Sequence, residues 1–254
     1  LKMGSNGPDE YLKQYYVQRI DNVDRVIQNE DPMVQKPSGY SQINLMQKIR
    51  FKPTKKWDFE YGFHYSETSE FSRYDRLIEK QSNGLPVSAV WNYGPQKWMM
   101  NNFTISHTAK NKLFDRMSVR LAQQSFEESR IDRRLNQNRL RTQVEEVQAY
   151  SANFDFEKNV DRHRIFYGAE YVLNEVTSRG SAVDIRNGNP LLVPDRYPES
   201  DWSSYAAYLN YQFVLSERFL LQAGTRFSAF NIHADFTRHL DFYPFDFTSS
   251  TTKN

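Results

Sequence analysis

The chain has 254 residues, of which 39% are hydrophobic and 15% aromatic, and it contains no cysteine. Disulfide bonds and thiolate metal sites are therefore excluded, and so is a helical membrane bundle, because no window of roughly 18 apolar residues occurs. A net charge of +2, from 33 basic and 31 acidic residues, gives no support for a nucleic acid partner.

The first 40 residues show no regular pattern. Residues 1–8 lack a charged segment followed by an apolar one, so they do not resemble a signal peptide. Residues 11–27 are β-compatible but have no consistently apolar face, and we expect an extended arm or an irregular hairpin on the side of the long loops. The last four residues are polar and follow no closing strand, so we interpret both ends as cuts within a longer protein.

The clearest predicted strand runs from Trp57 to Tyr65. Every odd position in it is aromatic, whereas the even positions are Asp58, Glu60, Gly62 and His64. Alternation with a period of two places the aromatic residues on one face of a sheet. The same alternation predicts eight strands, at about 43–51, 57–65, 99–105, 116–121, 150–156, 164–173, 205–213 and 219–228.

The predicted connections alternate in length along the chain. Short connections are expected at 52–56, 109–112, 158–162 and 215–218. Long connections are expected at 67–96, 127–146, 174–203 and from 231 onward. One end of the sheet would then have tight turns and the other long loops, as in outer-membrane barrels with short periplasmic turns and long extracellular loops.

Charged residues occupy the middle of the polar face in these predicted strands. They are Glu60, Arg116, Arg120, Glu170 and Arg226. Any half-buried antiparallel sheet shows alternation, but this sheet has no amphipathic helix to cover it, and in a barrel the charges would line a solvated lumen. We therefore predict an all-β antiparallel transmembrane barrel in the cell outer membrane, here a partial barrel of about eight to ten strands whose apolar face meets lipid.

Four segments carry a family resemblance. They are Asn29–Pro32, Ser72–Leu77, Trp91–Lys97 and Glu127–Arg134. Their order and spacing resemble the middle barrel region of TonB-dependent outer-membrane receptors of the Bacteroidetes type.

The resemblance implies several partners and a function. In that family a plug domain fills a 22-stranded barrel, and the TonB complex of the inner membrane energises uptake of scarce nutrients such as iron-siderophores, haem or glycans. This sequence shows no recognisable plug and no TonB box. Residues 1–254 would then be an internal fragment of a receptor barrel, without plug domain and C-terminal strands, and would not transport its small-molecule substrate alone.

Residues of the first long connection are candidates for ligand binding. Arg73, Asp75 and Arg76 could hold an anionic ligand through the guanidinium fork. The alternative is that they form ion pairs between loops, with residues such as Glu128 and Asp132.

Aromatic and histidine residues supply further candidates. Trp91 and Tyr93 would stack on a ligand ring or anchor the barrel at the membrane interface. His64 would point into the lumen near the loops, although solvated polar residues are the plain interpretation of all five histidines. The aromatic segment 242–247 would contact substrate or pack on a neighbouring loop. We expect no metal site and no cofactor.

Catalytic signatures are absent from the sequence, and we expect no enzyme. It contains no Gly-rich phosphate loop, no Gly-x-Ser-x-Gly and no His-Glu-x-x-His. Two alternatives to an uptake receptor stay open: a small closed barrel acting as a passive pore or adhesin, and a membrane-embedded hydrolase that uses Asp and His residues at the lumen mouth.

Overall fold

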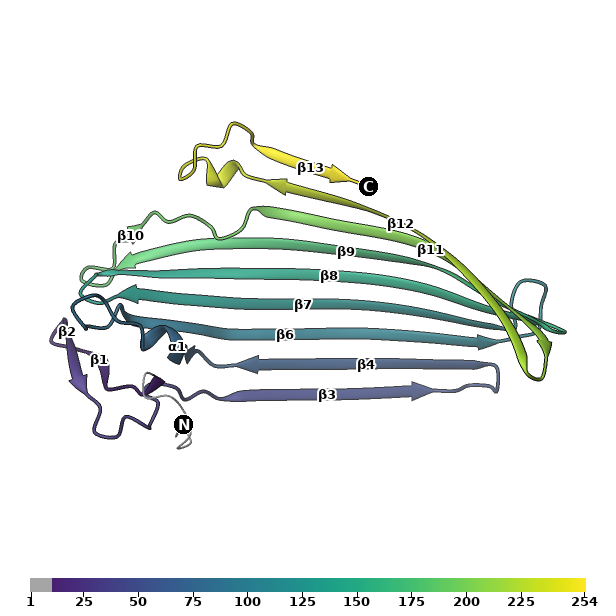
Figure 1. The fold of residues 1–254 in the computed structure, drawn as a ribbon, viewed down its shortest axis with the longest axis horizontal. Helices are drawn as coiled ribbons and strands as arrows, with labels where there is room; N and C mark the ends of the chain where they lie inside the picture. Colours follow the sequence, from purple (N-terminus) through teal and green to yellow (C-terminus); the bar gives the residue numbers. More distant parts are fainter. Residues whose placement is uncertain (1–10) are drawn as a thin grey trace.

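The computed structural model describes residues 11–254, so the expectation for residues 1–8 lies outside the described residues. One antiparallel sheet of 11 strands dominates the fold (Figure 1). Nine strands form a continuous path in the order β13, β12, β11, β9, β8, β7, β6, β4, β3, while β10 pairs with β9 and β5 with β6. The expected all-β antiparallel partial barrel is therefore confirmed.

Each of the eight predicted strands lies within an observed strand, although several of the observed strands are longer. The sheet contains β3 (Gln42–Phe51), β4 (Trp57–Thr68), β5 (Phe71–Ser72), β6 (Ser88–Thr108), β7 (Arg116–Arg134), β8 (Arg139–Val160), β9 (His163–Asp184), β10 (Pro190–Leu191), β11 (Glu199–Ser216), β12 (Phe219–Asp235) and β13 (Ser249–Lys253). The helical pieces are α1 (Tyr74–Leu77) and the 3-10 turn η2 (Thr237–His239). Within residues 11–254, no helix has the length and apolar character needed to cross a membrane.

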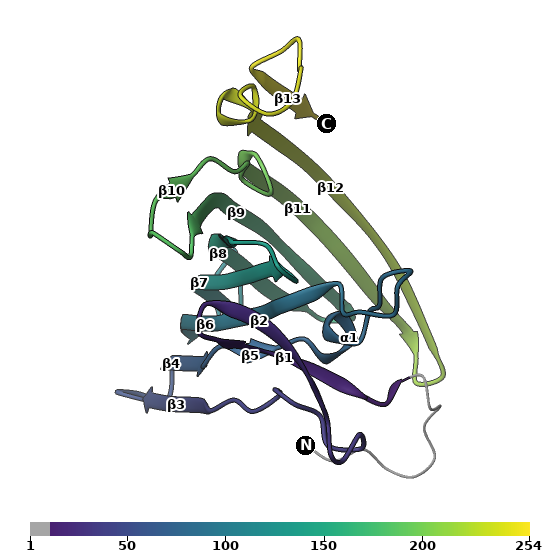
Figure 2. The same cartoon turned by 90° about the vertical axis from the view of Figure 1, so that its left-hand side faces the viewer.

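The sheet curves but does not close, as the two views in Figures 1 and 2 show. Its edge strands β3 and β13 are not paired with each other among the described residues. Both faces of β3 are exposed along its whole length. The backbone groups on the free edges of β3 and β13 are therefore available to further strands.

The two faces of the sheet differ in chemistry as the alternation predicts. On the polar face, three of the five charged residues expected there are paired across strands: Arg120 with Asp155 at 2.6 Å, and Arg226 with Glu170 at 2.8 Å. The hydroxyl of Tyr208 also donates to Asp155, at 2.5 Å. Such charges are tolerated in a membrane protein only where they face a lumen, so this face is the interior of the barrel.

A row of hydrogen-bonded polar side chains crosses the apolar face toward the end with the long loops. The hydroxyl of Tyr61 donates to Oδ1 of Asn101 at 2.6 Å, and Nδ2 of Asn101 donates to Oε1 of Gln123 at 2.8 Å. Gln123 continues to Gln148 at 3.4 Å, and Gln148 to Ser125 at 2.7 Å. Beyond this row, toward the long-loop end, this face is mostly polar on β7 and β8, with Ser125, Glu127 and Glu146, whereas β4 stays apolar up to Tyr65. On β7 and β8 the membrane boundary therefore lies at this row.

The short connections are confirmed, but most of the predicted long connections are strand. The segment 127–146 was expected to be a loop, yet β7 and β8 pair continuously up to the turn at 135–138. Likewise, β9 extends to Asp184 inside the predicted connection 174–203. These extensions rise roughly 30 Å above the membrane boundary at about 3.3 Å per residue. They have no apolar face, so alternation of hydrophobicity could not reveal them.

The N-terminal arm is a regular hairpin, contrary to the expected irregular one, and it lies at the loop end as expected. β1 (Tyr15–Ile20) pairs with β2 (Val23–Gln28) in a separate two-stranded sheet. The turn between them uses Asp21 at φ 49° and Asn22 at φ 60°, a left-handed conformation that these two residue types tolerate well.

Candidate ligand-binding site

A β-bulge in β6 determines which side chains face the barrel interior at the loop end. Tyr93 pairs with Arg130 and Gln96 with Glu128, so β6 has one more residue than β7 between these rungs. Odd residues of β6 lie on the apolar face below the bulge, whereas Trp91 and Tyr93 lie on the polar face above it. A bulge re-aims side chains in this way. These two rings are therefore not membrane anchors.

Gly94 makes the bulge possible. Its φ is +91°, and a Cβ at this position would lie 2.8 Å from the backbone oxygen of Ser69. Any other residue would be strained by the left-handed backbone and would collide with the neighbouring chain. The position of Trp91 and Tyr93 thus depends on a single glycine.

Two guanidinium groups stack on the two aromatic rings. Cζ of Arg73 lies 5.1 Å from the ring centroids of both Trp91 and Tyr93. Cζ of Arg130 lies 5.2 Å from the Trp91 ring and 5.4 Å from the Tyr93 ring. The Tyr93 hydroxyl accepts hydrogen bonds from Arg73 at 3.0 Å and from Arg130 at 3.1 Å. We call these four residues the arginine–aromatic cluster.

The neighbouring charges are paired differently from expectation. Arg73 forms a bidentate ion pair with Asp75, and this hydrogen bonding lowers the pKa of the Asp75 carboxyl. Arg76 pairs with Glu79 at 2.7 Å, and its Cζ lies 6.0 Å from the Trp91 ring. The expected partners are occupied elsewhere: Glu128 accepts from Gln96 at 3.0 Å, and Asp132 pairs with Arg141 at 2.7 Å. The alternative of loop-to-loop pairs with these two acids is thus wrong.

Arg130 keeps unused donors. It forms no ion pair with any carboxylate in residues 11–254, and its Nε is buried without a hydrogen-bond partner. A cavity of about 500 Å³ lies further along the same face, lined by Asp132, Arg134, Gln137, Arg139 and Arg141. This part of the wall therefore presents more guanidinium groups than carboxylates, which suits a ligand with negatively charged oxygens.

Two glutamates lie two residue pairs from Arg130 along the strands, on the same face and toward the short-turn end. Glu128 and Glu145 are directly opposite each other in the pairing of β7 with β8. The Glu145 side chain is only 9% exposed, and its nearest cation is Arg196, at 3.7 Å. Burial raises the pKa of the Glu145 carboxyl although Arg196 and Arg130 oppose the shift. The arginine-rich part of the polar face is therefore bordered by two acidic side chains, Glu128 and Glu145, on the side of the membrane.

The connection between β9 and β11 folds over this polar face. Asp195 accepts a hydrogen bond from the backbone N–H of Gly180 at 2.6 Å, and Arg238 holds its other oxygen at 2.5 Å. A Cβ on Gly180 would lie 2.3 Å from the backbone oxygen of Pro194, so the loop lies directly against β9. Burial alone would raise the pKa of Asp195, but the bonds from Arg238 and Gly180 lower it. This connection therefore covers part of the polar face at the loop end.

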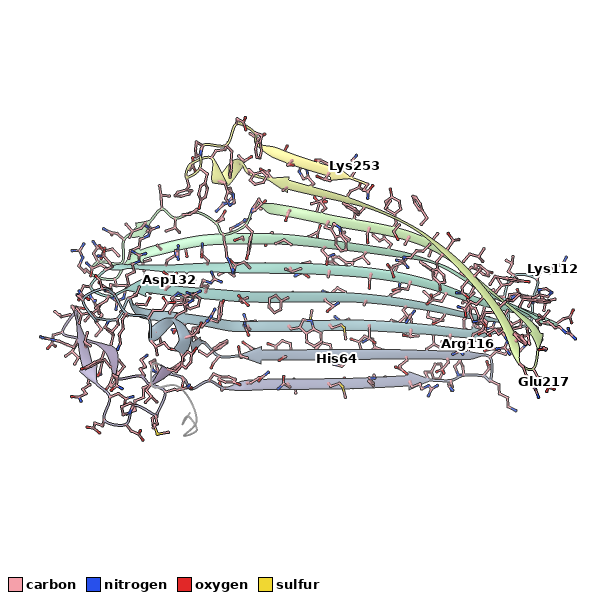
Figure 3. The ribbon with its side chains drawn as sticks, viewed as in Figure 1. His64, Lys112, Arg116, Asp132, Glu217 and Lys253 are labelled. Carbon is pink, nitrogen blue, oxygen red and sulfur yellow. The ribbon has the colours of Figure 1, made fainter. Side chains whose placement is uncertain are left out.

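Five of the six sequence candidates come together here: Arg73, Asp75, Arg76, Trp91 and Tyr93. The sixth, His64, lies on the polar face but midway along β4, away from the loop end where Asp132 lies (Figure 3). Its ring is 5.9 Å from that of Trp98.

The sequence analysis missed Arg130 as a site residue. The available signal was that Arg130 continues the alternation of Glu128 and Asp132, which would have placed it on the polar face. The aromatic segment 242–247 packs mainly on itself and on Phe236, whose ring lies 5.3 Å from Phe245 and 5.1 Å from Phe247. Among residues 11–254, no three His, Asp or Glu side chains are grouped so that they could hold a metal ion.

Comparison with known proteins places this geometry in a family. The outer membrane protein beta-barrel family matches residues 114–250, more than half of the chain. The chain therefore belongs to this family of outer-membrane barrels and is not an enzyme. A search of curated proteins gave no match.

Solved structures with the same fold include two named as transporters and one named as a receptor. The copper transporter OprC aligns with a TM-score of 0.61 at 11% identity, over 78% of this chain and 29% of its own. The unliganded ferric citrate transporter FecA gives 0.57 at 12% identity, over 86% and 32%. The siderophore receptor PiuA from Acinetobacter baumannii gives 0.58 at 13% identity, over 87% and 39%. The chain thus has the fold of part of such a barrel and spans less than two fifths of their length.

Proposed function

We propose that this chain is part of an outer-membrane receptor for the uptake of a scarce nutrient, energised by TonB. The substrate is an iron-siderophore, haem or a similar anionic chelate, and the arginine–aromatic cluster contacts it. A plug domain and the remaining barrel strands belong to the same receptor. The shared fold with the copper transporter, the ferric citrate transporter and the siderophore receptor supports this class of function.

The observation that carries the proposal is the stacking of Arg73 and Arg130 on Trp91 and Tyr93. The cluster faces the barrel interior at the end where a ligand would enter. Rings hold the guanidinium planes in place. The unpaired Nε of Arg130 is buried, but the terminal N–H groups carry a charge that no carboxylate in residues 11–254 neutralises. A chelate with carboxylate or phenolate oxygens would accept these donors, and its own rings would extend the stack.

The experiment uses the intact receptor and compares Arg73→Gln/Arg130→Gln with Arg186→Gln. The control residue pairs with Asp184 on the surface of the same end and touches none of the cluster. Loss of two charged donors at roughly 1.5–3 kcal/mol each predicts at least roughly a hundredfold weaker binding of ferric siderophores. The control should bind as the wild type does.

Energisation is tested separately by uptake of radiolabelled iron in cells with and without TonB. The proposal predicts that cells lacking TonB bind the chelate but do not accumulate it. Uptake that persists without TonB would support a passive pore instead. In the binding experiment, equal affinity of the double variant and the wild type would show that the arginine–aromatic cluster does not contact the ligand.

A further inference from the structure

The turn between β6 and β7 folds over the apolar face at the short-turn end. The Phe114 ring lies 6.1 Å from that of His107 and 5.7 Å from that of Phe156, and both partners belong to the apolar face. The Tyr167 hydroxyl donates to the backbone oxygen of Leu113 at 2.8 Å. Residues 109–115 therefore lie on the lipid side of the barrel wall, not across its opening.

This turn extends a band of aromatic rings. His107 stacks on Trp57 with centroids 3.9 Å apart, and Trp57 stacks on Phe59 at 5.7 Å. Phe156 stacks on Tyr167 at 5.1 Å. Rings that stand at one height around a barrel mark a membrane interface, where acyl chains meet headgroups. The short-turn end is the periplasmic one in such barrels, so this band meets the periplasmic leaflet.

Positive charge gathers at the same height. Residues 51–58, 107–117, 157–164 and 213–220 carry ten Lys and Arg against five Asp and Glu, although the net charge of the whole chain is only +2. The acidic residue nearest the turn is already satisfied, because Asp115 accepts from Lys158 at 2.8 Å and from the backbone N–H of Asn159 at 2.8 Å.

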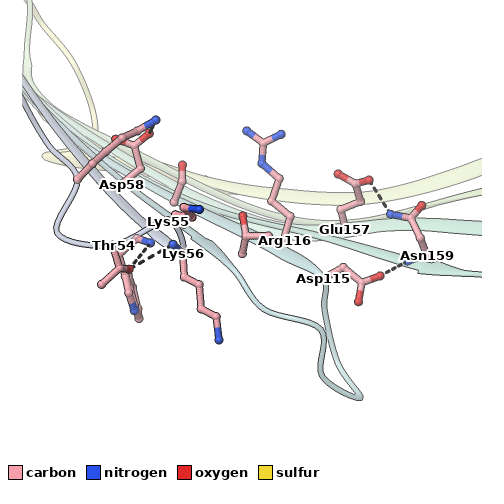
Figure 4. Close-up of a pocket in the computed structure, with 12 residues that line it drawn as sticks. Thr54, Lys55, Lys56, Asp58, Asp115, Arg116, Glu157 and Asn159 are labelled. Carbon is pink, nitrogen blue, oxygen red and sulfur yellow. Dashed lines mark hydrogen bonds and ion pairs between the residues drawn. The ribbon is translucent and has the colours of Figure 1, made fainter.

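Four exposed lysines in this region have no ion pair in the described part of the chain: Lys55, Lys56, Lys110 and Lys112. A backbone hydrogen bond of 2.9 Å from Thr108 to the oxygen of Lys56 joins their two turns. Figure 4 shows Lys56 pointing away from Arg116 and Glu157, which face the interior, and Figure 3 places Lys112 at the tip of this end.

We propose that Lys56, Lys110 and Lys112 bind the phosphate groups of anionic phospholipids in the periplasmic leaflet. These lysines lie on the periplasmic side of the band formed by Trp57, His107 and Phe114. The band contacts the glycerol and upper acyl region, and the lysines contact the headgroup. The charge excess selects anionic over zwitterionic headgroups, since each added lysine gains from the negative surface potential only when that potential exists. This lipid site does not depend on the proposed transport function.

The test measures lipid retention by the intact receptor. The protein is purified from vesicles of phosphatidylethanolamine and phosphatidylglycerol, and bound lipids are counted by native mass spectrometry. The variant is Lys110→Gln/Lys112→Gln, and the matched control is Lys36→Gln/Lys80→Gln, which removes the same charge at the loop end. Resistance of the folded band to sodium dodecyl sulfate at room temperature shows that each variant is folded.

The wild type and the control should retain phosphatidylglycerol in preference to phosphatidylethanolamine. The variant should lose that preference by roughly fivefold for each lysine removed, and Lys110→Arg/Lys112→Arg should keep it. Equal retention of the two lipids by the wild type, or an unchanged preference in the glutamine variant, would overturn the proposal.

Discussion

Arg133 of β7 holds Asp24 of β2 in a two-point ion pair, with Nη1 and Nη2 at 2.7 and 2.8 Å from the two carboxylate oxygens. The Asp24 side chain has no exposed surface, and that of Arg133 is 4% exposed. Asp24 also accepts from the backbone N–H of Asn136 at 2.8 Å. One carboxylate therefore ties the N-terminal hairpin to the top of the β7–β8 extension.

Replacement of Asp24 by Asn should release the hairpin. It would leave Arg133 buried without its counter-charge, at a cost of about 3 kcal/mol, so the β1–β2 amides should exchange with deuterium roughly 100-fold faster. Asp21→Asn is the control, because Asn tolerates the same left-handed turn. Equal protection in both variants would show that the ion pair does not hold the hairpin.

The same contact should depend on pH in a defined direction. Burial alone would raise the pKa of the Asp24 carboxyl, but bonds from Arg133 and Asn136 outweigh it and lower the pKa below 3.8. The stabilisation is therefore complete above pH 4 or so and is lost as the pH falls through the lowered pKa. The protection factors of the β1–β2 amides, which correct for the intrinsic pH dependence of exchange, should be unchanged between neutral pH and that range; a loss of protection near pH 6 would point to another group.

Gly94→Ala should disturb the site without touching any ligand-binding side chain. The backbone strain at φ +91° and the contact with Ser69 together should cost about 1–3 kcal/mol. Chelate binding should weaken because Trp91 and Tyr93 would no longer be held on the polar face. Gly39→Ala is the control, since a Cβ there meets nothing within 4 Å. Unchanged binding and melting temperature in Gly94→Ala would mean that the bulge tolerates a side chain.

Residues 1–254 expressed alone should aggregate. β3 and β13 have free edges among the described residues, and each unsatisfied backbone group in lipid costs several kcal/mol. Size-exclusion chromatography in detergent should show polydisperse material. A heat-resistant monomer would favour the small closed barrel as the native form.

The fold could be predicted from the sequence wherever one face of a strand meets lipid. Trp57 to Tyr65 shows this most clearly, because aromatic residues alternate with charged ones along β4. Prediction failed beyond the membrane boundary, toward the loop end, where Gln123, Gln148 and Glu175 replace the apolar residues and the strands continue with polar side chains on both faces.

The site could be predicted only in part for a related reason. Arg73, Trp91 and Tyr93 were recognisable as candidates by residue type. Their assembly with Arg130 depends on the bulge at Gly94, which reverses the faces of β6, and on long-range pairing of β6 with β7. The alternation of polar and apolar residues predicts neither the bulge nor the strand pairing. The ion pairs of Arg73 and Arg76 form locally, because their acidic partners lie two and three residues away.

One face of this sheet meets lipid over a limited height, and β9 offers the most direct measurement of that height. Since the chain has no cysteine, spin labels can be attached at single cysteines along β9 in the intact receptor in bilayers. Labels at odd positions from Ile165 to Leu173 should collide with oxygen, those at the even positions between them should collide with an aqueous nickel complex, and beyond Glu175 both faces should be aqueous. Absence of the alternation, or oxygen exposure that continues to Asp184, would contradict the account.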